Sequence, residues 1–319
     1  MLSLGIESTA HTFGVGVIDD SGKILVNEKS VFKNKKGMVP DEVAAHHKRV
    51  ADKIINKVLE KVKDIGLISY SHGPGLPPCL LVGMNKAVSL SKKLSVPLVG
   101  VNHCIAHLSI GDLVCKTKDP VYLYVSGANT QIIAFTNKKF RIFGETLDIG
   151  LGNALDKFGR ELNLGFPAGP VIERLAKNGK YVRLPYAVKG MDVSFSGLVT
   201  KAVRLVKEGK ASVNDVCFSF QETAFSMLAE VAERAMAHCN KSELLLIGGV
   251  GANKRLCEIL DIMCKERDAV FRSVPQDLAG DNGVMIAWQG LLQFKAGERL
   301  IKPDIFPYER TDAVVVSWR

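Results

Sequence analysis

The same order of strand-forming and helix-forming segments occurs twice along this 319-residue chain. Three short β-rich runs separated by tight turns open each copy, at residues 2–8, 13–19 and 24–31 and again at 121–127, 131–137 and 139–147. Each triplet is followed by segments with helical periodicity and by further apolar strands. The repeated order indicates an internally duplicated α/β chain, in which each copy builds its own sheet.

The two copies meet near residues 115–120, where charged residues and Pro120 interrupt the apolar pattern. A prior of roughly 150 residues per domain also gives about two domains for a chain of this length. We therefore predict an N-terminal lobe over residues 1–117, joined by the C-terminal segment at 295–319, and a C-terminal lobe over residues 118–294. A ligand is expected in the cleft between two such lobes.

Composition excludes several classes of protein. The seven cysteines are scattered without a C-x-x-C pair, which favours reduced thiols in the cytoplasm over a disulfide framework. The N-terminus, MLSLGIESTAHTFG, lacks the basic stretch and apolar run of a signal peptide. No apolar segment reaches the roughly 18–20 residues that a membrane span requires. A cytoplasmic protein without membrane contact is therefore predicted.

The formal net charge of +9 and the isoelectric point near 9.1 are compatible with a nucleic-acid partner. They are equally compatible with a lysine-rich surface that keeps the protein soluble. No low-complexity tail or long charge block accompanies the excess, so any nucleic acid would bind to a folded surface.

Two histidines stand four residues apart in the segment VNHCIAHLSIGD, which is predicted to begin a helix. His103 and His107 would then lie one above the other on a single helix face, where both imidazoles can reach one metal ion. A polar helix surface is the alternative for such a pair without further ligands. Cys104 points about 100° away around the helix and is assigned to packing.

Three turns rich in small residues follow predicted strands, in GIESTAHTFG, YVSGANTQ and LLLIGGVGANKRL. Glycine and serine at such turns let backbone N–H groups approach a phosphate closely, and a following helix N-terminus adds partial positive charge. One such turn has little specificity. Three of them in a duplicated fold favour a nucleotide held between the lobes.

A series of motifs extends these observations over the whole chain: GIESTAHTFGVGVID, SHGPGLPPCLLVG, GVNHCIAH, YVSGANTQ, GETLDIGLGNALDKFGR, GMDVSFSGL, QETAFSML, GGVGANKRL and GDNGVMIAW. In order and spacing they resemble the universal tRNA threonylcarbamoyladenosine biosynthesis proteins, and within them the catalytic subunit of the archaeal and eukaryotic KEOPS complex. The resemblance implies two RNase H-like lobes of the actin–hexokinase–chaperone type around a central ligand cleft.

The resemblance also implies one Fe or Zn ion per subunit. Its protein ligands would be His103, His107, Tyr124 and Asp281, a nitrogen and oxygen set that suits either metal. An adenine nucleotide or threonylcarbamoyl-adenylate is the implied substrate ligand. It would lie along Tyr124, Val125, Ser126, Gly127, Ala128, Asp156, Gly169, Glu173 and Asn253. Asn253 has a simpler alternative role as a helix N-cap.

The implied reaction transfers the threonylcarbamoyl group from threonylcarbamoyl-AMP to N6 of the adenosine at tRNA position 37, with release of AMP. Family members typically carry an acidic residue where this chain has His11. A neutral imidazole can take a proton near pH 7, so His11 is one candidate general base and Glu7 is the other. Ala128 replaces the family's common glycine, which puts the detailed ligand geometry in doubt.

The implied partners are tRNAs carrying adenosine at position 37, a small atypical kinase or ATPase subunit and a small dimerising KEOPS subunit. In some archaea the kinase is fused at the C-terminus. Basic and imidazole side chains of one loop and the following helix form the best candidate tRNA surface: Lys33, Lys35, Lys36, His46, His47, Lys48 and Arg49. An ordinary solvated face is the alternative for that helix.

Three other functions are alternatives for a chain with these motifs. The family was once described as an O-sialoglycoprotein endopeptidase, yet Cys104 stands where the H-E-x-x-H motif of metalloproteases has its general base. An ATP-driven chaperone, sugar kinase or DNA-maintenance protein of the same fold needs no His–His–Tyr–Asp set. A non-enzymatic scaffold would tolerate Asp281→Ala without loss of tRNA modification.

Overall fold

The computed structural model describes residues 1–33, 39–299 and 302–319 and divides them into two compact units. The first unit comprises Met1–Val114, Asn137–Lys139 and Asp281–Arg319. The second comprises Cys115–Thr136 and Phe140–Gly280. Each unit has its own five-stranded sheet and its own hydrophobic clusters, as the predicted duplication requires.

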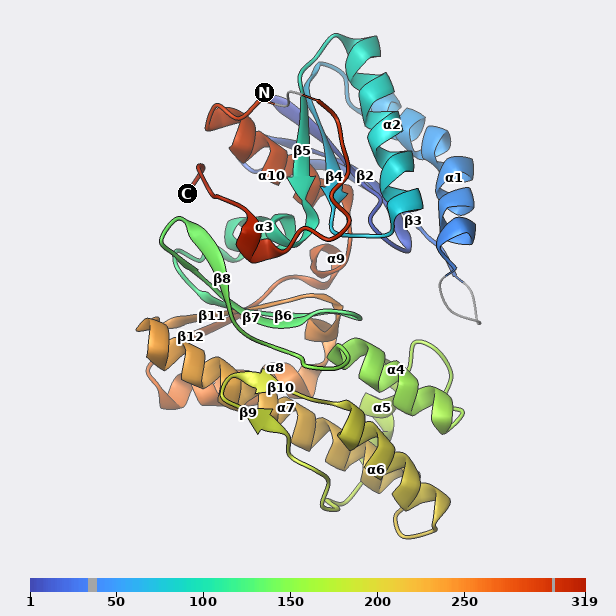
Figure 1. Ribbon diagram of the computed structural model, residues 1–319, viewed down its shortest axis with the longest axis vertical. Coiled ribbons are helices and arrows are strands. Elements are labelled where there is room, and N and C mark those ends of the chain that lie inside the picture. The colour runs from blue at the N-terminus through green and yellow to red at the C-terminus, as the bar shows by residue number, and fades with distance from the viewer. Residues whose placement is uncertain (34–38, 300–301) are drawn as a thin grey trace. The chain divides into compact units, whose positions relative to one another are not determined.

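The elements of the first unit are β1 (Leu2–Glu7), β2 (Thr12–Asp19), β3 (Ile24–Val31), α1 (Pro40–Lys61), β4 (Ile65–Gly73), α2 (Pro77–Leu94), β5 (Leu98–Asn102), α3 (His103–Cys115, whose last residue belongs to the second unit), α10 (Gly283–Lys295) and the 3-10 helix η2 (Thr311–Ala313) (Figure 1). The sheet order is β3-β2-β1-β4-β5. Strand β2 is antiparallel to β1 and β3, whereas β4 is parallel to β1 and β5.

The elements of the second unit are β6 (Val121–Val125), β7 (Thr130–Thr136), β8 (Lys139–Glu145), α4 (Leu151–Glu161), α5 (Gly169–Ala176), β9 (Val188–Lys189), β10 (Asp192–Val193), α6 (Ser196–Lys207), α7 (Val213–Cys239), β11 (Glu243–Ile247), the 3-10 helix η1 (Gly249–Ala252), α8 (Lys254–Glu266), β12 (Val270–Ser273) and α9 (Gln276–Ala279). Its main sheet has the order β12-β11-β6-β7-β8, which repeats the first sheet strand for strand. The predicted α/β duplication is therefore confirmed.

Strand alternation decides which side chains of β1 face the functional residues. Leu4 and Ile6 join the hydrophobic cluster formed with α1 and α2. Ser3 and Gly5 face the other way, since Ser3 Oγ donates a 2.8 Å hydrogen bond to the carbonyl of Ala287 on α10. Because alternate residues of a strand share a face, Glu7 lies on the side of the sheet covered by α10 and α3.

The boundary of the units differs from the one expected from the sequence, which assigned residues 118–294 to the C-terminal lobe. Helix α10 belongs instead to the first unit and lies against β1 and β2. The reason is backbone contact: a Cβ atom on Gly5 would lie 2.2 Å from Gly283 O and from Ala287 N. Only glycine permits helix and strand to approach so closely, and hydrophobic periodicity does not report that contact.

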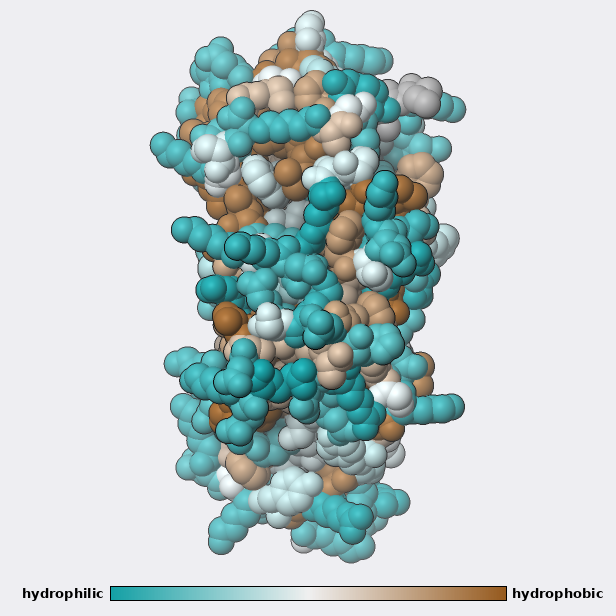
Figure 2. Space-filling view, turned by 90° about the vertical axis from the view of Figure 1, so that its left-hand side faces the viewer, coloured by the Kyte–Doolittle hydropathy of each residue, from teal (hydrophilic) through white to brown (hydrophobic). Residues whose placement is uncertain are grey.

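Helix α1 shows the charge distribution predicted for it, with Asp41 and Glu42 in the first turn and Lys61 in the last. Within the described part of the chain, every helix is too short or too polar to cross a bilayer. Hydrophilic side chains dominate the face shown in Figure 2, and hydrophobic ones are scattered in small groups.

Candidate functional site

Two histidines and one aspartate converge in the first unit. His103 and His107 lie on α3, and Asp281 lies two residues before the start of α10. Their candidate ligand atoms all lie within 4.8 Å of one another. Asp281 Oδ1 is 3.6 Å from His103 Nε2 and 3.4 Å from His107 Nε2. Two imidazole nitrogens and one carboxylate oxygen form a donor set that fits Fe or Zn.

A buried carboxylate orients the first of these histidines. Glu7 Oε2 lies 2.9 Å from His103 Nδ1, and the Glu7 side chain is fully shielded from solvent. Thr9 donates to Glu7 Oε1 from both its N–H, at 2.7 Å, and its hydroxyl, at 2.5 Å. With Nδ1 directed at Glu7, the Nε2 atom of His103 is the nitrogen that faces Asp281. A carboxylate behind a ligating histidine is a common arrangement in metal sites.

The electrostatics of the cluster follow from its burial and its carboxylates. Burial by itself lowers the pKa of His103, but the charge and hydrogen bond of Glu7, helped by Asp281, raise it to about 9. Burial and the charge of His103 lower the pKa of His107, although Asp281 opposes them. Burial raises the pKa of Asp281, yet the hydrogen bond from His107 and the nearby imidazoles lower it strongly. Asp281 is thereby kept as a carboxylate, the form in which it binds metal.

His11 lies at the edge of this cluster. Its Nδ1 atom is 3.8 Å from Asp281 Oδ2, and 46% of its side chain is exposed. The structure thus places His11 within reach of both solvent and the cluster, whereas Glu7 is buried and engaged with Thr9 and His103. Thr9 was not identified from the sequence. Its position two residues after Glu7, in the turn that follows β1, was the available signal.

The imidazoles of His46 and His47 do not face solvent, so the tRNA contact expected for them is corrected. Both side chains are buried, because they lie on the side of α1 that packs against β2 and β3. His47 Nε2 donates to the carbonyl of Ala10 at 2.8 Å, and the Nδ1 atoms of the two rings are 3.3 Å apart. His46 Nε2 lies 3.0 Å from Ser30 Oγ. The pair therefore supports the turn that carries His11.

Acid should weaken the first unit through His47. Burial lowers the pKa of His47 to about 4, helped by the charges of His46 and His11 and opposed by the Ala10 carbonyl and Glu7. In the unfolded chain His47 binds a proton as the pH falls through about 6.5, whereas in the folded chain it binds one only near pH 4. The free energy of unfolding is therefore retained above pH 6.5 and falls as the pH is lowered toward 4. Between pH 7 and pH 5 the expected loss is about 2 kcal/mol.

The variant His47→Gln tests this expectation, because a glutamine amide can donate to Ala10 O and does not titrate. Both tryptophans, Trp288 and Trp318, belong to the first unit, so urea unfolding followed by tryptophan fluorescence reports on that unit. We expect the wild type to lose about 2 kcal/mol more than His47→Gln on going from pH 7 to pH 5. Equal losses would show that His47 is not the titrating group.

The remaining residues of the predicted tRNA surface divide into two groups. Lys33, Lys48 and Arg49 are exposed and stay candidates for phosphate contact. Lys35 and Lys36 lie outside the described residues.

Two of the three predicted glycine-rich turns come together in the second unit, beyond β6 and β11. These strands are parallel, so their carboxyl ends share one edge of the sheet, where α/β proteins commonly bind ligands. A Cβ atom on Gly248 would lie 2.3 Å from Val125 O, and one on Gly152 would lie 2.6 Å from Ser126 O. Backbone therefore packs on backbone around residues 125–128. The turn is closed by Ser126 N–H, which donates to Asn129 O at 2.8 Å.

The predicted adenylate residues of the second unit lie on elements around this edge. Asp156 is four residues after Gly152 on α4 and therefore on the same helix face. Its Oδ1 accepts a 2.8 Å bond from the N–H of Ala168, which directly precedes Gly169. Burial is the main reason that the pKa of Asp156 is raised.

Helix α5 links these residues to the N-terminus of α8. Glu173 on α5 accepts a 2.9 Å bond from Lys254 N–H. Asn253 caps α8 by accepting from Leu256 N–H at 3.1 Å, and its amide nitrogen donates to Gln221 at 2.8 Å. The alternative considered for Asn253, an N-cap, is thus what the structure shows. Tyr124 is nearly fully buried near the end of β6.

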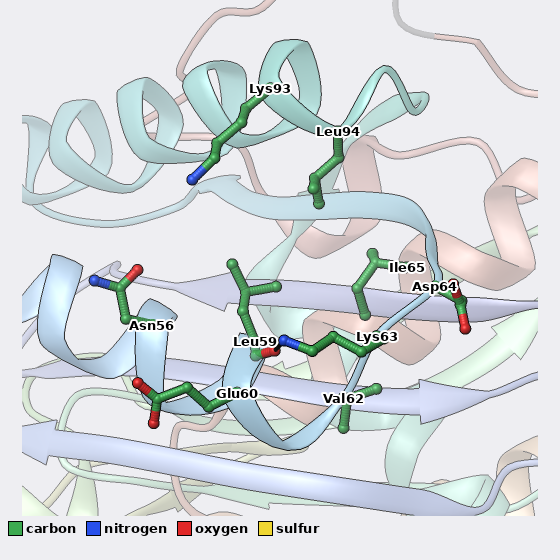
Figure 3. Close-up of a pocket in the computed structure, with 9 residues that line it drawn as sticks. All are labelled: Asn56, Leu59, Glu60, Val62, Lys63, Asp64, Ile65, Lys93 and Leu94. Carbon is green, nitrogen blue, oxygen red and sulfur yellow. Dashed lines mark hydrogen bonds between the residues drawn. The ribbon is translucent and has the colours of Figure 1, made fainter.

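A cavity of about 400 Å³ lies elsewhere in the first unit, between the C-terminal ends of α1 and α2 and the start of β4 (Figure 3). It is lined by Asn56, Leu59, Glu60, Val62, Lys63, Asp64, Ile65, Lys93 and Leu94. None of these residues belongs to the predicted site, and charges of both signs border the cavity.

Comparison with known proteins shows the family of this chain. Residues 22–288 match the family model described as TsaD, tRNA N6-adenosine threonylcarbamoyltransferase. The chain is 50% identical to the protein of that name from Thermococcus sibiricus, over 100% of both chains. It is also 50% identical to a probable bifunctional tRNA threonylcarbamoyladenosine biosynthesis protein from Methanocaldococcus jannaschii, and it spans 60% of that protein's length.

A solved structure supports the fold. The crystal structure of T. kodakarensis HypF matches 92% of this chain and 48% of its own length, with a TM-score of 0.66 and 16% sequence identity. Such a likeness concerns the fold alone and confirms the predicted fold class. The family match over most of the sequence is what identifies this protein. The chain belongs to the tRNA N6-adenosine threonylcarbamoyltransferase family.

Proposed function

We propose a metal-assisted mechanism for the activity of this family, the transfer of a threonylcarbamoyl group to N6 of an adenosine in tRNA. The observation that carries the proposal is the convergence of His103, His107 and Asp281 within 4.8 Å, with Glu7 behind His103. These three residues would hold one Fe or Zn ion. Bound there, the ion would act as a Lewis acid that polarises a substrate oxygen and helps to orient the substrate.

The reaction forms the bond between N6 of adenosine 37 and the carbamoyl carbon, and it breaks the bond between that carbon and a phosphate oxygen. AMP leaves with the electron pair. The amine loses one proton, which His11 is positioned to accept because it is both exposed and adjacent to the cluster. Glu7 is better suited to hold His103 in place than to act as the base, since both its oxygens are engaged.

The second unit would bind the adenylate at the shared edge of β6 and β11. The backbone N–H of Ser126 already donates to Asn129 O within the turn. The backbone N–H of Gly127 would therefore be the group that contacts the phosphate. Asp156 and Glu173 would accept hydrogen bonds from ribose hydroxyls. Asn253 would shape the site as the cap of α8. Tyr124 as a metal ligand remains a prediction from the resemblance.

The tRNA would contact the exposed basic residues Lys33, Lys48 and Arg49. A small kinase or ATPase subunit and a small dimerising subunit, as in the KEOPS complex, are the proposed protein partners. The Methanocaldococcus jannaschii relative is longer and is described as bifunctional. That description fits a partner activity fused to the transferase in one chain. The metalloprotease, chaperone and scaffold alternatives have no support from the family match.

The test supplies threonylcarbamoyl-AMP labelled in its threonine, together with unmodified tRNA, Zn²⁺- or Fe²⁺-loaded protein and its partner subunits. Label should enter tRNA with release of one AMP, and chelation of the metal should stop the transfer. A tRNA transcript carrying guanosine at position 37 is the matched control and should stay unlabelled. Absence of transfer by metal-loaded protein would contradict the mechanism.

A further inference from the structure

We propose that the C-terminal segment, residues 304–319, positions the metal-binding helix α3 through a contact between Glu309 and Asn102. The inference rests on the proposed function, because it assigns to this segment the orientation of His103 and His107. In Figure 1 the segment, drawn in red, runs beside β4 and β5 and reaches α3. All of these elements belong to the first unit.

Asn102 connects the segment to the helix. It is buried, it ends β5, and it directly precedes His103. Its side-chain oxygen accepts a 3.1 Å hydrogen bond from Ile105 N–H and so caps the first turn of α3. Its side-chain nitrogen donates to Glu309 Oε2 at 2.9 Å. Both the oxygen and the nitrogen of the Asn102 amide are therefore hydrogen-bonded. The two bonds fix the orientation of this N-cap side chain, which is next to His103 in the chain.

Glu309 is itself held in place from β4. His72 Nε2 lies 2.8 Å from the same Oε2 atom that Asn102 contacts. Burial raises the pKa of Glu309, but the hydrogen bonds from His72 and Asn102 and the charge of His72 lower it. One carboxylate oxygen thus accepts from two side chains, one on each of two neighbouring strands. A carboxylate is the side chain best suited to that position, since it is acceptor-only.

Further contacts anchor the rest of the segment. Tyr70 OH donates to Asp304 O at 2.9 Å, and Phe306 N–H donates to His72 O at 2.6 Å. Thr311 is buried at the start of η2. Arg319 Nη1 lies 3.0 Å from Asp112 Oδ2 near the end of the helix.

These contacts reach both ends of α3, the helix that carries two of the three converging ligands. Small displacements of a ligating histidine weaken metal binding, because the donor atoms have to meet at one point. The segment therefore serves as a positioning element for the metal site. Glu309 and Asn102 are positioning residues, since neither belongs to the ligand set.

The variant Glu309→Leu removes the oxygen that accepts from both Asn102 and His72. We expect hydrogen exchange of the α3 amides to increase about tenfold in the metal-free protein, since a partly released helix start opens more often. We also expect the affinity for Zn²⁺, measured by competition with a chelating dye, to fall about tenfold to a hundredfold.

Glu309→Gln is the conservative variant, because one amide oxygen can still accept from both Asn102 and His72. Its exchange and Zn²⁺ affinity should stay near the wild-type values. Asn102→Asp should instead resemble Glu309→Leu, because two carboxylates then face each other. Asp312→Asn is the matched control on the same segment, where the carboxylate pairs with Arg310, and it should change neither readout.

The outcomes separate this inference from the proposed function. Wild-type exchange and Zn²⁺ affinity in Glu309→Leu would overturn the inference, as would a Glu309→Gln protein as impaired as Glu309→Leu. A wild type that does not bind Zn²⁺ would contradict the proposed metal site, while exchange in the metal-free proteins still tests the contact. If Glu309→Leu does not fold, Arg319→Gln tests the other end of α3, where unchanged exchange would overturn the inference.

Discussion

Replacing His107 by alanine is expected to lower the rate of threonylcarbamoyl transfer by about a thousandfold, or roughly 4 kcal/mol in the transition state. His107 supplies one of three donor atoms that converge within 4.8 Å, and its side chain is almost fully buried beside Asp281. Alanine offers no donor, so the metal ion that we propose for this site should also be lost. Metal content by mass spectrometry and label transfer to tRNA measure both effects on the same preparation.

His238→Ala is the matched control. His238 lies near the end of α7 in the second unit, is exposed, and makes an edge contact with Phe143. The control should keep both metal and transfer activity. If His107→Ala retained its metal and its activity, the assignment of the site to His103, His107 and Asp281 would be wrong.

Gly283→Ala should destabilise the first unit by about 3 kcal/mol or more. A Cβ atom at this position would lie 2.2 Å from Gly16 N and 2.5 Å from the carbonyl carbon of Val15. Both are backbone atoms in the interior of β2, so neither can rotate away. Alanine is otherwise about 1 kcal/mol better than glycine within a helix, so overpacking has to exceed that gain. Urea unfolding followed by tryptophan fluorescence gives the free energy.

Gly197→Ala provides the control for this substitution. Gly197 lies in the first turn of α6, and a Cβ atom there would meet no heavy atom within 4 Å. Circular dichroism should show that this variant is as stable as the wild type, or slightly more stable. Because Gly283 is two residues from Asp281, Gly283→Ala should also weaken Zn²⁺ binding. A Gly283→Ala protein of unchanged stability would refute the close packing of α10 on β2.

The spacing of His103 and His107 predicted their shared face because a helix repeats every 3.6 residues, and that local rule holds in the structure. The role of Glu7 was less accessible. Strand alternation places Glu7 on the same side of β1 as Ser3 and Gly5. No sequence pattern near Glu7 predicts that α3 packs on that side of the sheet. The same limitation explains His46 and His47, which the charge pattern assigned to the surface and the packing of α1 buries.

The sequence alone determined the duplicated strand order, the helix with paired histidines and the family, because these depend on periodicity and on motifs whose residues are close neighbours in the chain. The tertiary structure decided that α10 belongs with the first sheet, which brings Asp281 to the histidines of α3. It also decided that Glu309, near the C-terminus, supports the cap of that helix. Both contacts join residues that are far apart in the chain. Such buried polar groups can form their hydrogen bonds only after the helices have packed on the sheet, so local sequence patterns do not predict them.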